Sequence, residues 1–508
     1  MRLFSKILTT VLTALLLAAS ATGKGKEFDI TFFGAKPGAF TMNTEAIQAA
    51  IDAAAKDGGT VIVPAGKFLT GSIELKSGIR FHLEKDAVLL GSTRYEDYHG
   101  LGGNHFSLVL AHNAENVIID GEGTIDGQGR ALALYVDSLF HRGVLPAERY
   151  DQNRPDEGFR PTVLQVTSSK NITVTGINIL NSACWVSQFW ECEDVVFDKV
   201  NTVSDAYPNN DGIDIGNCRN VKVVNCSFSC NDDGVCLKGT WNDRILIQNC
   251  RIQSGASAIK FGSGAGATNV TIKDIYVYDT LRSAVALECV NGDTIENILI
   301  DGITQTNSWM VFYFRLNTRR DKPGILRNIT VRNVSADVAF ERPDIWHESR
   351  FPGRQRGLDF NTFPCMIEGV PGLFVENVSF ENIRISHPGR GDEGTAYMPV
   401  WRMNTVPERE KEYPEHDLQG EMPSWGFYCR HVRGISFKDV SITAKWKDYR
   451  PAFVFDDVDG ITMDNVWISE PDEGPQIYLK DVKNADFGNQ KDNTATVTTE
   501  GLQLKKWD

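Results

Sequence analysis

The sequence has 508 residues, of which 42% are hydrophobic and 23% are charged, and its formal net charge is −14. This composition is typical of a soluble protein with a sizeable core and excludes a largely disordered chain. The excess of negative charge argues against a general nucleic-acid binder, because neutralising phosphates requires a basic surface.

The first residues are typical of a secretory signal. Two basic residues, Arg2 and Lys6, precede an apolar stretch that is too short to span a membrane, and a small-residue cleavage site ends at Ala21. We therefore expect residues 1–21 to be a signal peptide. The mature protein is predicted to be exported, periplasmic or extracellular, and free of the membrane after cleavage.

A helix is predicted next, ahead of the strand-rich part of the chain. Asn43 is a suitable N-cap, an alanine- and isoleucine-rich stretch runs to Lys56, and Gly58 or Gly59 ends the helix. If the following residues form a solenoid, such a helix would cover its open end.

A short unit recurs from residue 116 onwards. Each unit has a turn residue, two alternating apolar positions, a polar bend and another alternating stretch. The units begin at Asn116, Asn171, Asp194, Asn220, Arg244, Asn269, Asn297, Asn328, Gly372, Gly434 and Gly460. In the middle of the series the starts at 171, 194, 220, 244, 269 and 297 differ by 23, 26, 24, 25 and 28 residues.

This period, with β-branched residues at alternate positions and no amphipathic helix inside the unit, predicts short strands wound into a coil. The fold class is therefore all-β, a right-handed parallel β-helix with an N-terminal helical cap and long loop insertions. One catalytic domain is predicted over residues 22–485, with the cap and first coils in 22–95 and a C-terminal tail in 486–508. Nothing in the repeats specifies a dimer, and a monomer is expected.

Two long insertions interrupt the repeats. Residues 131–159 and residues 341–360 are aromatic and basic enough to wall one end of a groove. Arg350, Arg354 and Arg356 in the second insertion could meet an acidic ligand. If the groove binds a polymer, these insertions favour action at a chain end over cleavage within a chain.

The ten cysteines do not predict a metal site. Seven of them lie between residues 184 and 250, with no CxxC pair and no histidine nearby. Buried thiols stacked between repeats are the simplest interpretation, and disulfide pairing cannot be deduced from sequence. No metal and no cofactor are predicted.

Three consecutive units can be placed in register on their apolar residues. The residues that then face the core are Ile213, Ile215, Val235, Leu237, Ile259 and Phe261. Asp214, Cys236 and Lys260 occupy positions between them and should point away from the core, and so should Lys238.

In this register Asp211 stacks on Asp233, with Asp232 beside it and Ser257 in the next unit. Neighbouring strands lie about 4.8 Å apart, so the three carboxylates should cluster. Because like charges repel, at least one carboxyl should keep a proton near neutral pH. Glycoside hydrolysis requires one protonated acid and one ionised base, so the cluster indicates a catalytic site.

Acidic residues in β-helix turns can also serve as caps or bind calcium. A single Asp-Gly pair would favour that interpretation. Two sets in register, one of them doubled, favour catalysis. The outward lysines that follow, Lys238 and Lys260, suit a substrate that carries its own negative charge.

The chain resembles a known family in these residues and in three other stretches. Asn209-Asn210-Asp211 is similar to the family's Asn-Thr-Asp motif, and residues 231–233 are similar to its Gly/Gln-Asp-Asp motif. The other stretches are "ITFFGAKPG", "RPTVLQVTSSKNITVTGINILNSACW" and "SWGFYCRHVRGISFKDV". From about residue 29 to about residue 482 the chain resembles glycoside hydrolase family 28, the polygalacturonase and rhamnogalacturonan hydrolase family, and in particular its bacterial exported branch.

The resemblance implies roles for the carboxylates. Asp232 would be the general acid, Asp211 and Asp233 would position and deprotonate the water, and cleavage would invert the anomeric carbon. The substrate would be an acidic plant cell-wall polysaccharide or oligosaccharide with galacturonate- or rhamnogalacturonan-type linkages. The expected substrate-binding residues are Lys238, Lys260, Asp214, Arg282, Asn209 and Trp185.

The sequence departs from the family in two places. The histidine of the Gly-His-Gly motif is replaced by Ser257, and no histidine lies between residues 141 and 347. Where the Arg-Ile-Lys motif should lie, Arg282 is the only cation, and Glu288 is expected to point outward. A branched or modified pectic fragment therefore becomes a better candidate substrate than plain polygalacturonan.

Two alternatives remain open at this point. A β-helix polysaccharide lyase would use calcium, with Asp232 and Asp233 as ligands, and would be sensitive to a chelator. A non-catalytic carbohydrate-binding β-helix would bind glycan without releasing a product.

Overall fold

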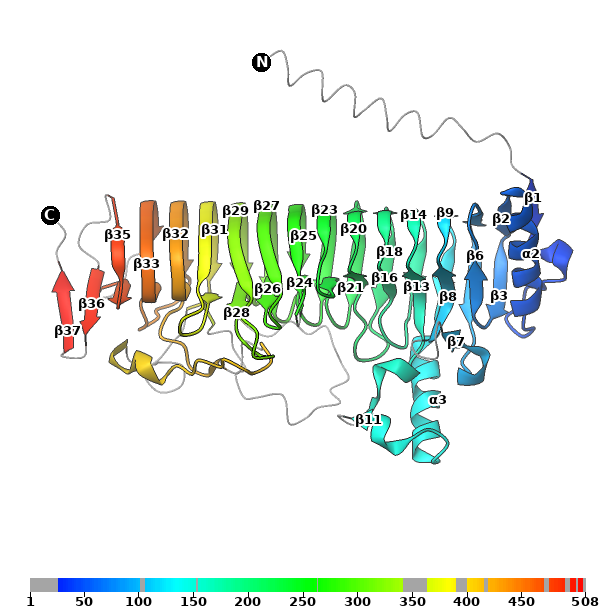
Figure 1. Cartoon of the computed structure of the whole chain (residues 1–508), viewed down its shortest axis with the longest axis horizontal. Coiled ribbons are helices and arrows are strands. Elements are labelled where there is room, and N and C mark those ends of the chain that lie inside the picture. Colours follow the sequence, from blue (N-terminus) through cyan, green and yellow to red (C-terminus); the bar gives the residue numbers. More distant parts are fainter. Residues whose placement is uncertain are drawn as a thin grey trace, which may run out of the picture.

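The computed structural model describes residues 26–100, 106–151, 154–262, 264–340, 363–389, 400–414, 419–469, 475–488, 494–498 and 501–505. The predicted signal peptide and the predicted wall at residues 341–360 lie outside these ranges. Figure 1 shows an elongated stack of coils that runs from the N-terminal helix at one end to the C-terminal strands at the other. The predicted parallel β-helix is confirmed.

Three parallel ladders run along the coil axis. The site sheet carries the carboxylate cluster. Its strands, in order, are β4 (Ile73–Leu75), β8 (Phe106–His112), β13 (Thr162–Thr167), β16 (Ser187–Trp190), β19 (Ile213–Gly216), β22 (Val235–Lys238), β24 (Ile259–Phe261), β26 (Ser283–Cys289), β28 (Met310–Leu316), β30 (Cys365–Glu368), the first parts of β32 (Phe427–Ala444) and β33 (Phe453–Ile468), β34 (Ile477–Lys480) and β36 (Thr494–Thr498).

The second sheet is made of separate strands in the early coils and of the first parts of longer strands in the later coils. Its strands are β1 (Glu27–Asp29), β2 (Thr60–Val63), β5 (Arg80–Leu83), β9 (Glu115–Gly121), β14 (Lys170–Thr175), β17 (Glu193–Asp198), β20 (Arg219–Val224), the first parts of β23 (Asp243–Ser254), β25 (Ala267–Tyr278), β27 (Thr294–Ser308), β29 (Ile325–Val338) and β31 (Val375–His387), the middle of β32 and β33, and β35 (Lys483–Asp486).

The third sheet completes each coil. It consists of β3 (Gly66–Thr70), β6 (Ala87–Gly91), β10 (Thr124–Asp126), β15 (Asn178–Leu180), β18 (Asn201–Ser204), β21 (Ser227–Cys230) and the last parts of β23, β25, β27, β29, β31, β32 and β33. Every pairing between coils in these ladders is parallel. Parallel strands require crossover connections, which are right-handed in almost all proteins.

The core lies inside the coil, where alternate residues of each strand stack on their counterparts in the next coil. Ile213, Val235, Ile259 and Val285 form one such stack and are completely buried. Within the described residues all ten cysteines are buried free thiols, as the sequence suggested. Apolar burial along the whole axis is therefore the main source of stability.

The turns between sheets are held by a ladder of asparagine and aspartate side chains. Asn171, Asn220 and Asn297 adopt left-handed backbone conformations with φ of 53°, 55° and 58°, which asparagine tolerates better than most residues. The amide of Asn171 donates to Asn116 at 2.6 Å, and that of Asn220 donates to Asp194 at 2.6 Å. Each turn is thus bonded to the turn one coil earlier.

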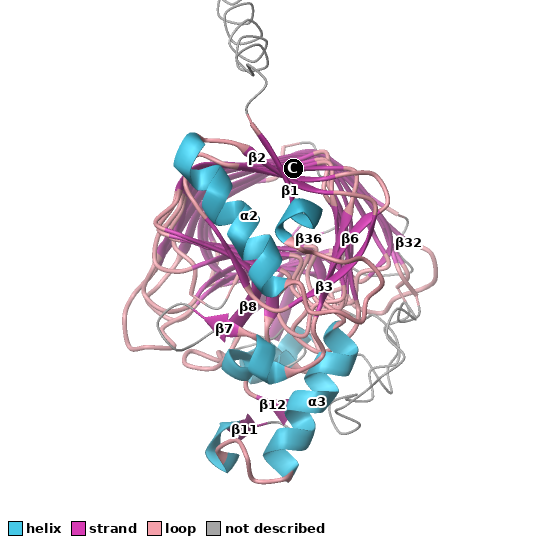
Figure 2. Cartoon of the chain, turned by 90° about the vertical axis from the view of Figure 1, so that its right-hand side faces the viewer, coloured by secondary structure: helices cyan, strands magenta, loops and turns pink. Residues whose placement is uncertain are grey.

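Helix α2 (Thr44–Asp57) covers the N-terminal end of the coil, as predicted, and Gly58 ends it with φ of 69°. Asn43 precedes the helix, but its side chain does not cap it. Its Oδ1 instead accepts a hydrogen bond from the Lys36 amide at 2.7 Å, and its Nδ2 donates to the carbonyl of Thr41 at 2.7 Å. Figure 2, which views the coil from this end, shows α2 lying across the opening.

The insertion at residues 131–159 is partly helical rather than a simple loop. Helix α3 (Gly129–His141) leads into a short antiparallel pair, β11 (Tyr150–Asp151) and β12 (Arg154–Pro155). Short 3-10 helices are η1 (Ile30–Phe33), η2 (Tyr95–Asp97), η4 (Ala147–Arg149), η5 (Glu157–Phe159) and η6 (Val400–Thr405).

Both ends carry small antiparallel additions. β7 (His99–Gly100) pairs with β8, and β37 (Gly501–Lys505) pairs with β36, so two strands lie beyond residue 485. In the part of the chain that the structure describes, none of the helices has the length and apolar character needed to cross a membrane.

Candidate active site

Two consecutive coils place the carboxylates at the start of the site sheet's strands. Asp211 lies just before β19, and Asp232 and Asp233 lie just before β22. The predicted register is confirmed: Ile213 pairs with Val235 and Val235 with Ile259. The acidic residues therefore lie in successive turns at the same edge of the sheet.

Backbone hydrogen bonds fix these turns against each other. The Gly212 amide donates to the Asp233 carbonyl at 2.9 Å, and the Gly234 amide donates to the Ser257 carbonyl at 3.0 Å. The Ser257 amide also donates to Oδ1 of Asp233 at 3.0 Å. Ser257, which replaces the expected histidine, thus holds a catalytic candidate through its main chain.

The glycines that follow the aspartates are required by close packing between coils. A Cβ at Gly212 would lie 2.5 Å from the carbonyl oxygen of Gly234, and one at Gly234 would lie 2.4 Å from a methyl group of Ile252. Gly255 is tighter still, with the Asn231 carbonyl oxygen 2.1 Å from the added carbon. The Asp-Gly pattern therefore reflects steric need as well as chemistry.

Lys238 binds two carboxylates at once. Its Nζ lies 2.9 Å from Oδ2 of Asp211 and 3.0 Å from Oδ1 of Asp214. Burial raises the pKa of both carboxyls, and that of Asp211 rises well above its usual value. One ammonium group offsets only one of the two buried negative charges, so this trio keeps a proton to a higher pH than ordinary aspartates do.

Lys238 itself stays charged. Burial alone would lower its pKa, but Asp211 and Asp214 outweigh that effect and raise the pKa well above its usual value. The ammonium group also lies 4.8 Å from the centre of the Trp185 ring, and Trp185 is half-buried. The expected pair of Lys238 and Trp185 is thus brought together beside Asp211.

Lys260 lies among acidic groups two coils further along the axis than Asp214. Its Nζ is 3.5 Å from Oδ2 of Asp233 and 3.6 Å from Oε1 of Glu288, and it also contacts the Tyr413 hydroxyl at 3.5 Å. Lys260 is 3% exposed. The structure thus pairs Lys260 with Asp233, and its expected role in substrate binding stays a prediction.

Asp214 and Glu288 leave the core as predicted but are not open to solvent, because both are at most 3% exposed. Each faces a lysine at the outer surface of the site sheet. The expected role of Asp214 in substrate binding stays a prediction.

Asp232 is the most accessible of the three candidate catalytic carboxylates, being half-buried whereas Asp211 and Asp233 are buried. Its Oδ1 accepts a hydrogen bond from the Asp233 amide at 3.0 Å. Burial raises the pKa of Asp232, the charge of Asp233 raises it further, and Arg282 lowers it. Arg282, an expected substrate-binding residue, is thus close enough to Asp232 to lower the pKa of its carboxyl.

Asn209, an expected substrate-binding residue, is half-buried and fixed by a hydrogen bond to its side-chain oxygen. Its Oδ1 accepts a hydrogen bond from the buried Arg160 guanidinium at 2.8 Å, and φ of Asn209 is 64°. Arg160 also donates to the carbonyl of Pro208 at 2.6 Å. This buried arginine fixes the turn that carries Asp211.

The donor set that best approximates a cation site is Asp211, Asp233 and Cys236, whose ligand atoms lie within 4.8 Å of one another. Lys238 and Lys260 already pair with these two carboxylates at 2.9 and 3.5 Å. A divalent cation would have to compete with two ammonium groups for the same oxygens. The arrangement fits charge neutralisation by lysine better than calcium binding.

Sequence reasoning missed three contributors to the site. Tyr413 reaches Lys260 from 153 residues away, and Arg319 lies 5.1 Å from the centre of the Tyr413 ring. Arg160 anchors Asn209. Tyr413 and Arg319 lie outside the repeat pattern, and no motif marks them, whereas Arg160 begins a stretch that the sequence did single out.

The site sheet continues beyond Glu288 as a ladder of alternating charge. The successive residues Glu288, Arg315, Glu368, Arg430, Asp456 and Lys480 are paired in register and none is exposed. The segment of residues 400–414 covers part of this ladder, with the Arg315 guanidinium donating to the Glu408 and Arg409 carbonyls.

Comparisons with known proteins agree with this geometry. The chain is 29% identical over 312 residues to a probable polygalacturonase from Vitis vinifera, covering 54% of this chain and 60% of that protein. It is 28% identical over 442 residues to an exo-poly-alpha-D-galacturonosidase from Dickeya chrysanthemi, covering 72% of this chain and 73% of that protein.

The solved structure of a hyperthermoactive exopolygalacturonase from Thermotoga maritima shares the fold. The TM-score is 0.56 and the identity is 24%, with 71% of this chain and 87% of that chain covered. The chain spans about 60% of the length of the first curated relatives that it matches. The model of glycosyl hydrolases family 28 matches residues 55–286, which include all the candidate carboxylates. Over these residues the chain is similar to glycosyl hydrolases family 28, and the relatives named above are similar over a longer part of it.

Proposed function

We propose that this protein is an exported inverting glycosidase that hydrolyses pectic polysaccharide or oligosaccharide. The observation that carries the proposal is the placement of Asp211, Asp232 and Asp233 in successive turns of the site sheet, each with a defined charged neighbour. Relatives named as polygalacturonases support the substrate class.

Asp232 serves as the general acid. It is the most accessible carboxyl of the three, and its raised pKa keeps it protonated at higher pH than an ordinary aspartate. A protonated carboxyl can donate to the leaving glycosidic oxygen, which then departs as an alcohol.

Asp233, with Asp211, activates the water. Two contacts stabilise the negative charge of Asp233. The Ser257 amide donates a hydrogen bond to its Oδ1, and the ammonium group of Lys260 lies near its Oδ2. Asp211 and Asp214 share one proton and one cation, the ammonium group of Lys238. Water attack from the face opposite the leaving group inverts the anomeric centre.

The substrate's carboxylate is met by arginine rather than by the family's Arg-Ile-Lys motif. Arg282 acts on Asp232 electrostatically, and Arg319 is exposed beside Tyr413. Lys260 is not available for this task because it is buried among Asp233 and Glu288. These arginines replace the family's motif, so the galacturonate unit would bind in a different position from one in plain polygalacturonan. A branched or modified fragment fits this arrangement.

Action at a chain end is supported by what flanks the site coils. In Figure 1, α3 and the segment of residues 400–414 project from the same side of the β-helix, on either side of β19 to β26 along its axis. Tyr413 from this segment reaches Lys260. Two projections that bracket the carboxylates would limit how many sugar units a chain can place across them.

The test is to incubate the purified protein with pectic oligosaccharides, with and without chelator, beside an Asp232→Asn variant, and to follow products by mass spectrometry and proton NMR. Saturated products with inverted anomers, absent with the variant and unaffected by chelator, would support the proposal. Unsaturated, calcium-dependent products would make the protein a lyase. Glycan binding with no product would make it a non-catalytic binding protein.

A further inference from the structure

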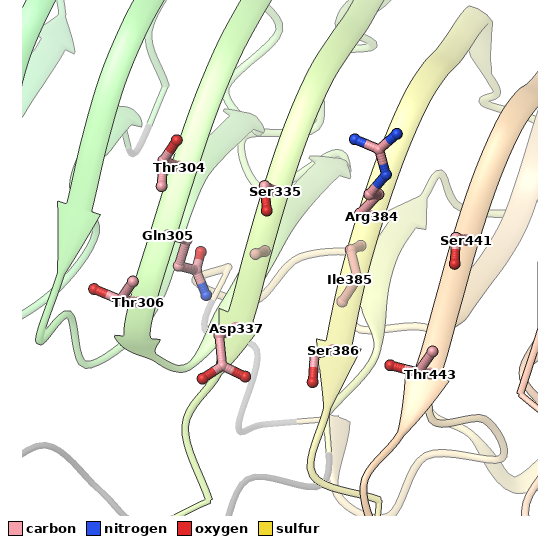
Figure 3. Close-up of a pocket in the computed structure, with 11 residues that line it drawn as sticks. Thr304, Gln305, Thr306, Ser335, Asp337, Arg384, Ile385, Ser386, Ser441 and Thr443 are labelled. Atoms are coloured by element: carbon pink, nitrogen blue, oxygen red, sulfur yellow. The ribbon is translucent and has the colours of Figure 1, made fainter.

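A shallow polar groove of about 390 Å³ lies on the third sheet, away from the carboxylates. It is lined by residues of β27, β29, β31 and β32. Figure 3 shows its outward side chains in two lines, with Thr304, Ser335, Arg384 and Ser441 in one and Thr306, Asp337, Ser386 and Thr443 in the other.

The first line extends beyond the groove to aromatic side chains at both ends. In register along the third sheet, Tyr276 pairs with Thr304 and Ser441 pairs with Trp467. Five strand spacings separate Tyr276 from Trp467, which is about 24 Å. A hydroxyl-rich track of this length, with an aromatic ring at each end, can contact several sugar units of an extended chain.

The polar groups of the track are left for a ligand. Within the described residues, the side-chain hydroxyls of Thr304, Ser335 and Ser441 have no hydrogen-bond partner in the protein, and Arg384 has neither a hydrogen bond nor an ion pair. Trp467 is 54% exposed. An exposed indole in line with free hydroxyls is unusual for a surface that only faces water.

The charge of the groove favours an acidic ligand. Its one carboxylate, Asp337, is paired with Lys445 at 2.5 Å, which leaves the positive charge of Arg384 uncompensated among the described residues. On the second sheet, by contrast, Arg327 is paired with Glu296 at 2.7 Å. Arg251, which lies 4.2 Å from the Tyr278 ring centre, adds a second cation near the end of the track.

We propose that this track, defined by Tyr276, Thr304, Ser335, Arg384, Ser441 and Trp467, is a second, non-catalytic binding site for an acidic polysaccharide chain. Arg384 binds a uronate carboxylate, and the aromatic rings pack against sugar faces. The site goes beyond the proposed hydrolysis, because it lies on a different sheet and contains none of the carboxylates of the active site.

The position of the track suits a holding role. The track begins on β25, and the neighbouring strand β23 leads into a turn beside the active site. The Ser254 hydroxyl at the end of β23 donates to the Asp232 carbonyl at 2.6 Å. A polysaccharide held here stays close to the carboxylates around the corner of the coil. Effective concentration at the active site then rises for polymers and not for short fragments.

The test is affinity electrophoresis of the full chain in gels that contain polygalacturonate, with dextran gels as the neutral comparison. All proteins carry Asp232→Asn so that the polymer is not degraded. We expect polygalacturonate to retard the parent and the double variant Arg384→Ala and Trp467→Ala to bind about tenfold more weakly. Lys222→Ala, which removes an exposed cation from the second sheet, should bind like the parent.

Three results would each overturn the proposal. The parent is not retarded, dextran retards it as much as polygalacturonate does, or the double variant is retarded as much as the parent. Hydrolysis is measured separately with Asp232 restored. There the double variant should keep its kcat/KM on a short oligosaccharide and lose activity on polymer. Failure of the proposed hydrolysis would appear as no product from the wild-type protein and would leave the retardation result standing by itself.

Discussion

The ammonium group of Lys238 lies 2.9 Å from Oδ2 of Asp211, a residue of the preceding coil. This contact ties two successive turns of the active site together and places a positive charge beside one of the proposed water-activating carboxylates. Asp214, 3.0 Å from the same ammonium group, makes the pair a trio with one uncompensated charge. The protonation of this trio therefore decides how the site is charged.

Replacing Asp232 with asparagine should lower kcat by about 10²- to 10⁴-fold, because the leaving oxygen loses its proton donor. The fold should survive, since asparagine has the same shape and the Asp233 amide can still donate to its side-chain oxygen. Hydrolysis of a pectic oligosaccharide followed by NMR measures the loss. Asp464→Asn, an exposed carboxylate on β33, is the matched control, and an Asp232→Asn rate within tenfold of wild type would remove Asp232 from its role.

Replacing Lys238 with methionine should destabilise the protein by about 3 kcal/mol, because Asp211 and Asp214 would share a buried site without their cation. Urea denaturation at pH 7 measures the free energy of unfolding. Lys222→Met, on the outer face of β20, should change it little. Adding Asp214→Asn to Lys238→Met should restore part of the loss, and a purely additive double variant would show that the two groups do not interact.

The Asp214 carboxyl predicts a pH dependence of stability. Its pKa is raised above the ordinary value of 3.8, first by burial, so the folded protein binds a proton that the unfolded chain has already released. The contribution of Asp214 to the free energy of unfolding therefore decreases as pH rises from about 3.8 through the raised pKa. Asp214→Asn removes this titration, and the variant should gain stability relative to wild type as pH increases.

Unfolding of both proteins in urea between pH 5 and pH 8 measures that difference. Comparing variant with wild type cancels the titration of buried groups away from the trio, such as His387, whose pKa burial lowers to about 4. A difference that stays constant over this range, or that falls as pH increases, would contradict the prediction.

Gly255→Ala tests the packing beneath the catalytic turn. The added carbon would lie 2.1 Å from the Asn231 carbonyl oxygen, so the turn that carries Asp232 must shift. We expect a loss of about 1–3 kcal/mol in stability and a fall in kcat. In Gly158→Ala the nearest atom, at 3.0 Å, is a side-chain oxygen of Asp156, so this variant should be tolerated. Wild-type kcat in a folded Gly255→Ala variant would show that the turn has room to move.

The fold and the register of the site were predictable because a parallel β-helix repeats its inward apolar positions in every coil. The pairing of Ile213 with Val235 and Ile259 follows from that pattern alone, and it brings Asp211 and Asp233 together. Handedness and the cap at α2 follow from equally local or general rules.

The rest depended on contacts that no local pattern encodes. Lys260 looks like an outward, solvated lysine in sequence, yet Glu288 and Tyr413 enclose it from the next coil and from a segment 153 residues away. The side-chain cap expected at Asn43 was absent because the backbone of a neighbouring loop provided a better partner. Helix α3 was missed because its apolar residues lie within an insertion that interrupts the repeat.

The ladder that bonds each turn to the turn before it has a consequence for how such a chain can change in length. A whole coil duplicated at Asn297 would find the same partners as its template, because Asn297 donates to Asn269 just as Asn328 donates to Asn297. A fraction of a coil would instead rotate every later residue to another sheet. Growth by complete turns is therefore neutral for the scaffold except between the paired strands β19 and β22, where an added coil would separate Asp211 from Asp232.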